Sequence, residues 1–194
     1  LGQFSKSLDD FDQTIDLDSV PDPIHYLNRG NTYIKMKDFD FNGLFILDLA
    51  NNHQGELDHG LNIINALGSV VSEVGVRAAI KFQFRQLDTF VHPEFNDRDD
   101  VPHIPRFLST RLSPDDYKQL IAAVRNHGMV PMCTPFDEES VQLIQQLDID
   151  VIKIASCSAT DIPLLESVAA AGMPTVASTG GMEIKDIDKL VQIF

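Results

Sequence analysis

Short apolar runs alternate along the chain with longer stretches in which apolar residues recur every three or four positions. In the first of these stretches, Leu57, Leu61 and Ile64 fall on one face of a predicted helix. A regular order of strand and helix predicts an α/β fold built on a parallel sheet. The predicted strands lie near residues 44–49, 77–84, 129–134, 150–156 and 174–178.

Capping residues support the same boundaries. An N-cap side chain accepts a hydrogen bond from the first turn of a helix, and glycine commonly ends a helix in the left-handed conformation. Helix starts are predicted at Ser113 before Pro114, at Asp137, and at Thr160 or Asp161. Helix ends are predicted at Gly75, Gly128 and Gly172.

Two lysines interrupt the apolar strands. Lys81 stands between Ile80 and Phe82, and Lys153 has similar surroundings in the run 150–156. Strand side chains alternate between faces, and a buried ammonium is costly unless an anion meets it. The pair therefore predicts a shared site for a small, multiply charged anion. The alternative is that each lysine closes a structural ion pair or reaches solvent from a strand end.

Polar residues gather where each predicted strand ends. Parallel α/β folds bind their ligands at this edge of the sheet. The strand-end residues are Asp48, Asn51, Asn52 and His53; Gln83 and Arg85; Thr134; Ser156 and Ser158; Ser178 and Thr179.

Two segments depart from the regular rhythm. Residues 1–42 are polar and rich in aspartate, and we interpret them as an irregular lead-in with a possible short strand or hairpin arm at 32–37. Residues 43–194 form the predicted domain. Within it, residues 86–112 make a long connection that we interpret as a lid over the strand ends.

The composition of the chain argues against some classes of binding partner. The net charge of −14 argues against nucleic-acid binding, and no apolar run has the length of a membrane helix. The two cysteines, Cys133 and Cys157, lack the spacing of a metal or redox motif. Reduced thiols favour a cytoplasmic protein.

Five motifs together resemble the sialic acid synthase family. In chain order they are ILDLANNHQG at 46–55, IKFQ at 80–83, CTPFD at 133–137, IKIAS at 152–156 and PTVASTGGM at 174–182. The resemblance implies a TIM (β/α)8-type barrel of which this chain holds about the first five βα units. Strands six to eight and a small antifreeze-like domain are expected outside this sequence.

The resemblance also implies an activity. Members of the family condense phosphoenolpyruvate with an N-acetylated aldose, such as N-acetylmannosamine, and form a nine-carbon 2-keto acid and phosphate. They require Mn²⁺ or Mg²⁺, which histidines on later strands bind, so no metal ligand is expected in this chain. They are commonly homodimers. Residues 1–194 alone are expected to be inactive.

Site residues follow from the same motifs. Lys81 and Lys153 match the lysines that hold phosphoenolpyruvate. Thr134 and Ser156 match hydroxyl donors to its phosphate or carboxylate, and Gln83 matches a glutamine that faces the sugar.

Three positions depart from the family pattern. Phe84 replaces a small polar residue that commonly follows the glutamine. Asp48 stands where a glutamate is more usual, so its catalytic part in handling a proton or water is changed. Ser158 stands where an acidic residue contacts the sugar, which implies an altered acceptor. Asn52 and Ser178 complete the predicted substrate-binding set, whereas His53 is interpreted as a packing or hydrogen-bonding residue of the loop.

Two other functions remain open at this stage. A Schiff-base aldolase would use Lys81 or Lys153 as a nucleophile with a lowered pKa. A barrel without activity could serve as a scaffold or sugar-binding module, which the departures at Asp48 and Ser158 allow.

Overall fold

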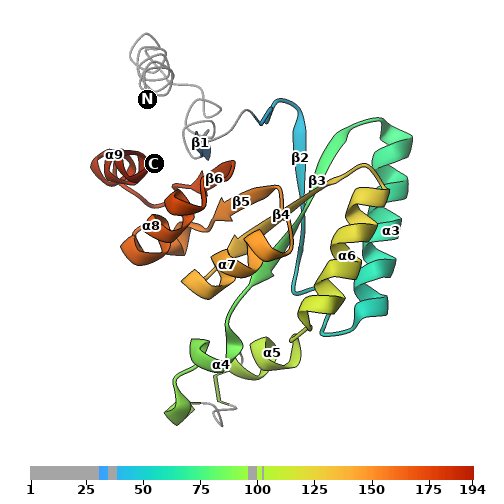
Figure 1. Ribbon diagram of the computed structural model, residues 1–194, viewed down its shortest axis with the longest axis horizontal. Helices are drawn as coiled ribbons and strands as arrows, with labels where there is room; N and C mark the ends of the chain where they lie inside the picture. The colour runs from blue at the N-terminus through green and yellow to red at the C-terminus, as the bar shows by residue number, and fades with distance from the viewer. Residues whose placement is uncertain (1–30, 35–38, 96–99, 102) are drawn as a thin grey trace.

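A curled sheet with helices along one side forms the body of the protein (Figure 1). The computed structural model describes residues 31–34, 39–95, 100–101 and 103–194. The strands within them follow the order β1-β6-β5-β4-β3-β2. Five of these are parallel, namely β2 (Leu44–Ala50), β3 (Arg77–Phe84), β4 (Val130–Pro135), β5 (Val151–Ile154) and β6 (Thr175–Ser178).

Each parallel strand is followed by a helix, so the predicted alternation and the partial (β/α)8-type barrel are confirmed. The long helices are α3 (Leu57–Val74), α6 (Pro114–Asn126), α7 (Glu138–Gln146), α8 (Ile162–Ala171) and α9 (Ile184–Ile193). Ser113 caps α6 through a reciprocal pair of bonds with Asp116, and Asp137 caps α7. Asp161, rather than Thr160, caps α8. The three predicted helix-ending glycines all have positive φ angles.

Strand β1 (Asn31–Ile34) pairs antiparallel with β6 at one edge of the sheet. It begins one residue before the strand or hairpin arm predicted at 32–37. Residues 35–37 of that predicted arm lie outside the described residues. The interpretation of residues 1–30 as irregular likewise lies outside the described part of the chain.

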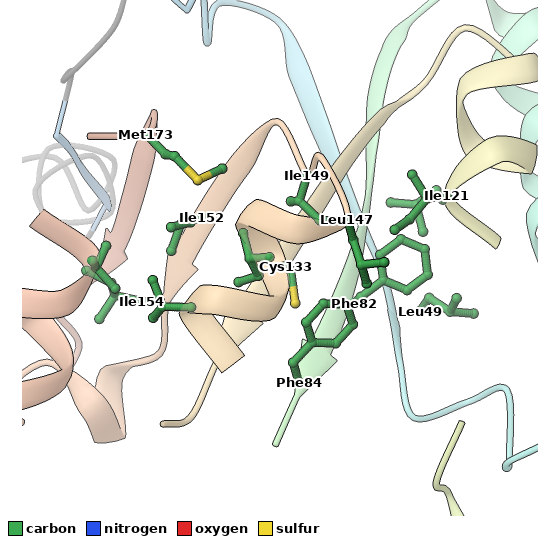
Figure 2. Packing of buried hydrophobic residues seen from close by; sticks show 14 of the residues in the cluster. Leu49, Phe82, Phe84, Ile121, Cys133, Leu147, Ile149, Ile152, Ile154 and Met173 are labelled. Atoms are coloured by element: carbon green, nitrogen blue, oxygen red, sulfur yellow. The ribbon is translucent and has the colours of Figure 1, made fainter. Parts of the chain in front are cut away.

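Large apolar side chains fill the space between the sheet and the helices. Ile80, Phe82 and Phe84 of β3 and Ile152 and Ile154 of β5 are each at most 2% exposed. Figure 2 shows Phe82, Phe84, Ile152 and Ile154 among the side chains of this cluster. Burial of each such side chain contributes about 1.5–3 kcal/mol. The alternation of strand side chains then turns the residues between them, the two lysines included, toward the other face.

That other, inner face is apolar at its amino-terminal half. Ala79, Met132, Val151 and Val176 are buried together there. Phe39, Phe41 and Leu44 pack against this cluster at the start of β2. The inner face therefore has an apolar floor, and its polar residues lie nearer the carboxyl ends of the strands.

The long connection after β3 is partly helical rather than structureless. It contains α4 (Leu87–Phe90), the 3₁₀ turn η1 (Pro93–Phe95) and α5 (His103–Ser109), which lie beyond the carboxyl end of β3 (Figure 1). Gly55, in the loop after β2, meets the end of α5. Its φ is +79°, and a Cβ atom there would lie 2.4 Å from the carbonyl oxygen of Ser109. Only glycine allows this approach.

Candidate functional site

The two lysines lie on the same face of the sheet, as predicted. Lys81 is directly opposite Met132, and Met132 is directly opposite Val151. Lys153 follows Val151 by two residues and therefore points the same way. Both ammonium groups face the interior of the curled sheet, beyond its apolar floor.

Lys81 is paired with a carboxylate. Its Nζ lies 2.9 Å from Oδ2 of Asp48, and its side chain is 14% exposed, against 53% for Asp48. The register of β2 shifts between Asp48 and Ala50, and Ala50 has a φ of +44°. This bulge ends the regular pairing just beyond Asp48, where a strand can redirect a functional side chain.

Lys153 has uncharged partners instead. Its Nζ donates to Oγ of Ser178 at 2.5 Å and to the carbonyl oxygen of Ile154 at 2.8 Å. Burial, and to a smaller extent the nearby charge of Lys81, lower the pKa of Lys153 to about 8, although the carboxylate of Asp48 acts in the opposite direction. Keeping Lys153 protonated therefore costs free energy, and a bound anion would lower that cost.

Gln83 and Thr134 lie opposite one another at the ends of β3 and β4. Thr134 is 2% exposed, and its Oγ1 has no hydrogen-bond partner among the described residues. A buried hydroxyl without a partner costs about 1–3 kcal/mol. This position therefore suits a bound oxygen, in keeping with the hydroxyl donor predicted for Thr134.

The remaining predicted substrate contacts are more scattered. Ser156 is exposed and opens the 3₁₀ turn η2 (Ser156–Ser158) directly after β5. Ser158 is buried, with its Oγ 3.9 Å from Sγ of Cys157. Asn52 is exposed, and its side chain donates to the carbonyl oxygen of Asp48 at 3.5 Å. Their parts in binding stay predictions.

His53 lies on the helix side of the sheet and not with the lysines. It is fully buried, its Nδ1 accepts the N–H of Gly55 at 3.1 Å, and its ring meets Tyr117 edge-on. Burial lowers its pKa to about 4, so the ring is neutral at neutral pH. The interpretation of His53 as a packing residue is confirmed.

The described residues do not by themselves build a metal site. No group of three or more His, Cys, Asp or Glu side chains in this part of the chain could hold a metal ion. At the strand ends Asp48 offers a carboxylate, but Lys81 already pairs with it. The Mn²⁺ or Mg²⁺ requirement therefore remains a prediction, and no step is derived through the metal.

Arg85 has a structural setting that the sequence did not reveal. Its Cζ lies 3.8 Å from the ring centroid of Phe136 and 4.5 Å from that of Phe107. One guanidinium nitrogen donates to Oε1 of Gln83 at 3.1 Å. The sequence showed Arg85 only as a strand-end polar residue. The sequence signal for this stacking was an arginine directly after a buried strand, followed by segments that contain several phenylalanines.

A cavity of about 390 Å³ adjoins Gln83 and Arg85 on the side of α6 and α7. The long connection borders it through Phe107 and Leu112, and Tyr117 of α6 forms another wall. Neither lysine lines it. Residues 86–112, the predicted lid, thus border a cavity next to the lysine site. Whether this segment also covers the two lysines stays a prediction.

These observations define the class of the protein. Parallel strands that curl with helices outside them, and polar side chains at the carboxyl ends of the strands, are typical of (β/α)8 barrels. A sequence profile of the NeuB family matches residues 69–194, and the chain belongs to this family. The resemblance to sialic acid synthases is thereby confirmed.

Individual relatives agree with this assignment. The chain is 26% identical over 168 residues to N,N'-diacetyllegionaminic acid synthase of Legionella pneumophila, covering 82% of this chain and 46% of that protein. It is 25% identical over 159 residues to N-acetylneuraminate-9-phosphate synthase of Mus musculus, covering 77% and 44%. The crystal structure of a candidate spore coat polysaccharide biosynthesis protein E from Chromobacterium violaceum is 47% identical, with a TM-score of 0.75, covering 78% and 45%. The chain thus spans less than half the length of each.

Proposed function

We propose that the complete protein carrying this chain is a sugar-acid synthase. It condenses phosphoenolpyruvate with an N-acetylated aldose similar to N-acetylmannosamine, and releases a nine-carbon 2-keto acid and phosphate. The observation that carries this proposal is the pair of inward lysines at the strand ends, with Lys153 bonded only to uncharged oxygens in the described structure. Membership in the NeuB family supports the same class of reaction.

The residues on the inner face would bind the first substrate. Phosphoenolpyruvate carries about three negative charges near neutral pH and needs compact cations and short donors around it. Lys81 and Lys153 supply the cations. Thr134, Ser156 and Ser178 supply hydroxyl groups, and the apolar floor below them limits access of water to the site.

The proposed chemistry forms one carbon–carbon bond, and a new carbon–oxygen bond from water at C2 replaces the carbon–oxygen bond to phosphate. C3 of phosphoenolpyruvate bonds to the aldehyde carbon of the sugar, water adds to C2, and the tetrahedral intermediate loses phosphate. Asp48 is exposed beside Lys81 and would accept or return the proton of that water. Gln83 would contact the sugar, together with Asn52 and Ser158.

Phosphate release tests the proposal directly. The complete protein is incubated with phosphoenolpyruvate, Mn²⁺ or Mg²⁺, and a panel of N-acetyl sugars, and phosphate and keto acid are measured. We expect release that depends on one class of sugar and is lost in Lys81→Ala and Lys153→Ala. Undiminished turnover in both variants contradicts the lysine assignment. Release with residues 1–194 alone contradicts the expectation that this part is inactive.

One observation favours a second candidate, the Schiff-base aldolase. A lysine nucleophile needs a lowered pKa, and that of Lys153 falls to about 8 beside a second ammonium group. Borohydride trapping with pyruvate separates the two functions. A covalent adduct on Lys153 favours the aldolase, whereas phosphate release without an adduct favours the synthase. If neither occurs with any acceptor, the non-catalytic barrel is favoured.

We also propose a cytoplasmic homodimer that binds small molecules and no nucleic acid. Among the described residues, no helix is long and apolar enough to cross a membrane. Both cysteines are free thiols, which suits a reducing compartment. Light scattering of the complete protein and cell fractionation test these two points.

A further inference from the structure

Gln83 stands next to the proposed anion site and makes one specific contact. It follows Lys81 by two residues on β3, so both side chains share the inner face. Its Oε1 accepts a hydrogen bond from Nη2 of Arg85 at 3.1 Å. Its amide nitrogen makes no hydrogen bond with any residue that the structure describes.

The chemistry of arginine decides the orientation of this amide. A guanidinium group donates only, so the amide atom that faces Arg85 must be the oxygen. The two N–H groups of Gln83 then occupy the other branch of the planar amide, away from Arg85. A glutamine without such a neighbour could rotate and present either its oxygen or its nitrogen to a ligand.

Arg85 is itself held in place by aromatic rings. Its Cζ lies 3.8 Å from the ring centroid of Phe136, 4.5 Å from that of Phe107 and 5.5 Å from that of Phe90. Phe90 and Phe107 belong to the long connection, and Phe136 follows β4. Stacking of a guanidinium group on aromatic faces favours one arrangement of the side chain. The donor that fixes Gln83 is therefore itself fixed.

We propose that Arg85 is a positioning residue that turns the N–H groups of Gln83 toward the bound sugar. The sugar acceptor must then present a hydrogen-bond acceptor at this point, such as an acyl carbonyl or a hydroxyl oxygen. The inference rests on the proposed function, because it assigns the acceptor contact of the same site. It assigns to Arg85 no contact with substrate.

A double-mutant cycle in the complete protein tests this inference. Arg85→Ala, Gln83→Ala and the double variant are compared by kcat and by KM for each substrate. We expect Arg85→Ala to raise the KM for the sugar about threefold to tenfold, and by less than Gln83→Ala does, because the freed amide can still present its nitrogen part of the time. The KM for phosphoenolpyruvate should change less than about twofold. The double variant should be no worse than Gln83→Ala, because Arg85 acts through Gln83.

Two further variants separate positioning from loss of structure. Gln83→Glu keeps an oxygen for Arg85 but removes the N–H donors, so it should impair sugar binding as strongly as Gln83→Ala while keeping the melting temperature. Arg85→Lys keeps a positive charge over the rings and should retain the fold with partial sugar binding. Arg125→Ala is the matched control, because Arg125 pairs with Asp150 and does not line the cavity beside Gln83.

Three outcomes overturn the inference. Additive effects of the Arg85 and Gln83 variants would mean that Arg85 only braces the connection. Equal rises in KM for both substrates would mean the same. Full sugar binding by Gln83→Glu would show that no donor is needed there.

Failure of the proposed function would look different. If the wild-type protein releases no phosphate with any sugar, that function is wrong, and the inference is then judged from the side-chain amide signal of Gln83 in NMR spectra. A pair of N–H chemical shifts that moves in Arg85→Ala to the values of a freely rotating glutamine side chain supports the fixed orientation. An identical signal in both proteins overturns it.

Discussion

Lys81 and Lys153 occupy equivalent places on two strands, yet their surroundings differ. Lys81 meets a carboxylate 2.9 Å away, so its charge is balanced before any ligand binds. Lys153 meets a hydroxyl and a carbonyl oxygen and carries a lowered pKa. Lys81 is therefore half of an ion pair, whereas Lys153 contacts no carboxylate among the residues that the structure describes.

The difference shows how the folded sheet can hold two ammonium groups on one face before any anion binds. Two adjacent ammonium groups repel each other, and the Asp48 carboxylate offsets part of that repulsion. An incoming phosphate or carboxylate would complete the balance at Lys153. Variants at these three positions can separate the two contributions.

Loss of either ammonium group should have the largest effect. We expect Lys153→Ala and Lys81→Ala in the complete protein each to weaken phosphoenolpyruvate binding by about a hundredfold or more, as truncation of a buried charged partner does. Titration calorimetry measures the loss. Lys118→Ala is the control, because Lys118 is exposed and pairs with Asp115. Unchanged affinity in both test variants would remove the basis of the anion site.

Binding should also depend on pH through Lys153. In the free protein this group loses its proton near pH 8, so anion affinity should fall about tenfold per pH unit above that value. Lys153→Arg should shift this fall to much higher pH. The free energy of unfolding should show the opposite trend and rise with pH above about 8, because the unfolded chain holds this proton more tightly. A flat binding profile between pH 7 and about 10 would contradict the assignment.

Neutralising Asp48 should have a smaller effect that distinguishes the two lysines. We expect Asp48→Asn to raise anion affinity a few-fold in the wild type, because it removes a like charge. In the Lys81→Ala background the gain should reach about tenfold, since Asp48 would otherwise be unpaired there. The gain in the Lys153→Ala background should resemble that in the wild type. Equal gains in affinity in all three backgrounds would mean that the Asp48–Lys81 ion pair does not influence anion binding.

The bulge beside Asp48 should show the smallest effect. Ala50 adopts a φ of +44°, which glycine tolerates better than alanine. Ala50→Gly should therefore raise the free energy of unfolding by up to about 1 kcal/mol. Ala66→Gly, at an exposed position inside α3, should lower it by about 0.5–1 kcal/mol. Urea denaturation checks whether the two signs differ.

Much of the fold could be predicted because strand and helix periodicities leave distinct patterns. The alternation around Lys81 placed it on the face opposite Ile80 and Phe82, and the register confirms that Lys153 lies on the same face. Local capping chemistry gave the starts of α6 and α7. These features depend on neighbours within a few residues, which a sequence displays directly.

The features that could not be predicted depend on contacts between distant segments. The pairing of Asp48 with Lys81 follows from the register between two strands and from a bulge. The stacking of Arg85 on Phe107 and Phe136 needs the path of the long connection, which its proline-rich sequence does not reveal. The antiparallel place of β1 beside β6 likewise joins segments far apart in the chain.

The glycine in the loop after β2 has a mechanical consequence. A methyl group at Gly55 would collide with the main chain of Ser109, which has no rotatable side-chain atom to move aside. The end of α5 would have to shift outward, and Phe107, two residues earlier, would move with it. Position 55 therefore helps to set how closely the ring of Phe107 approaches the guanidinium group of Arg85.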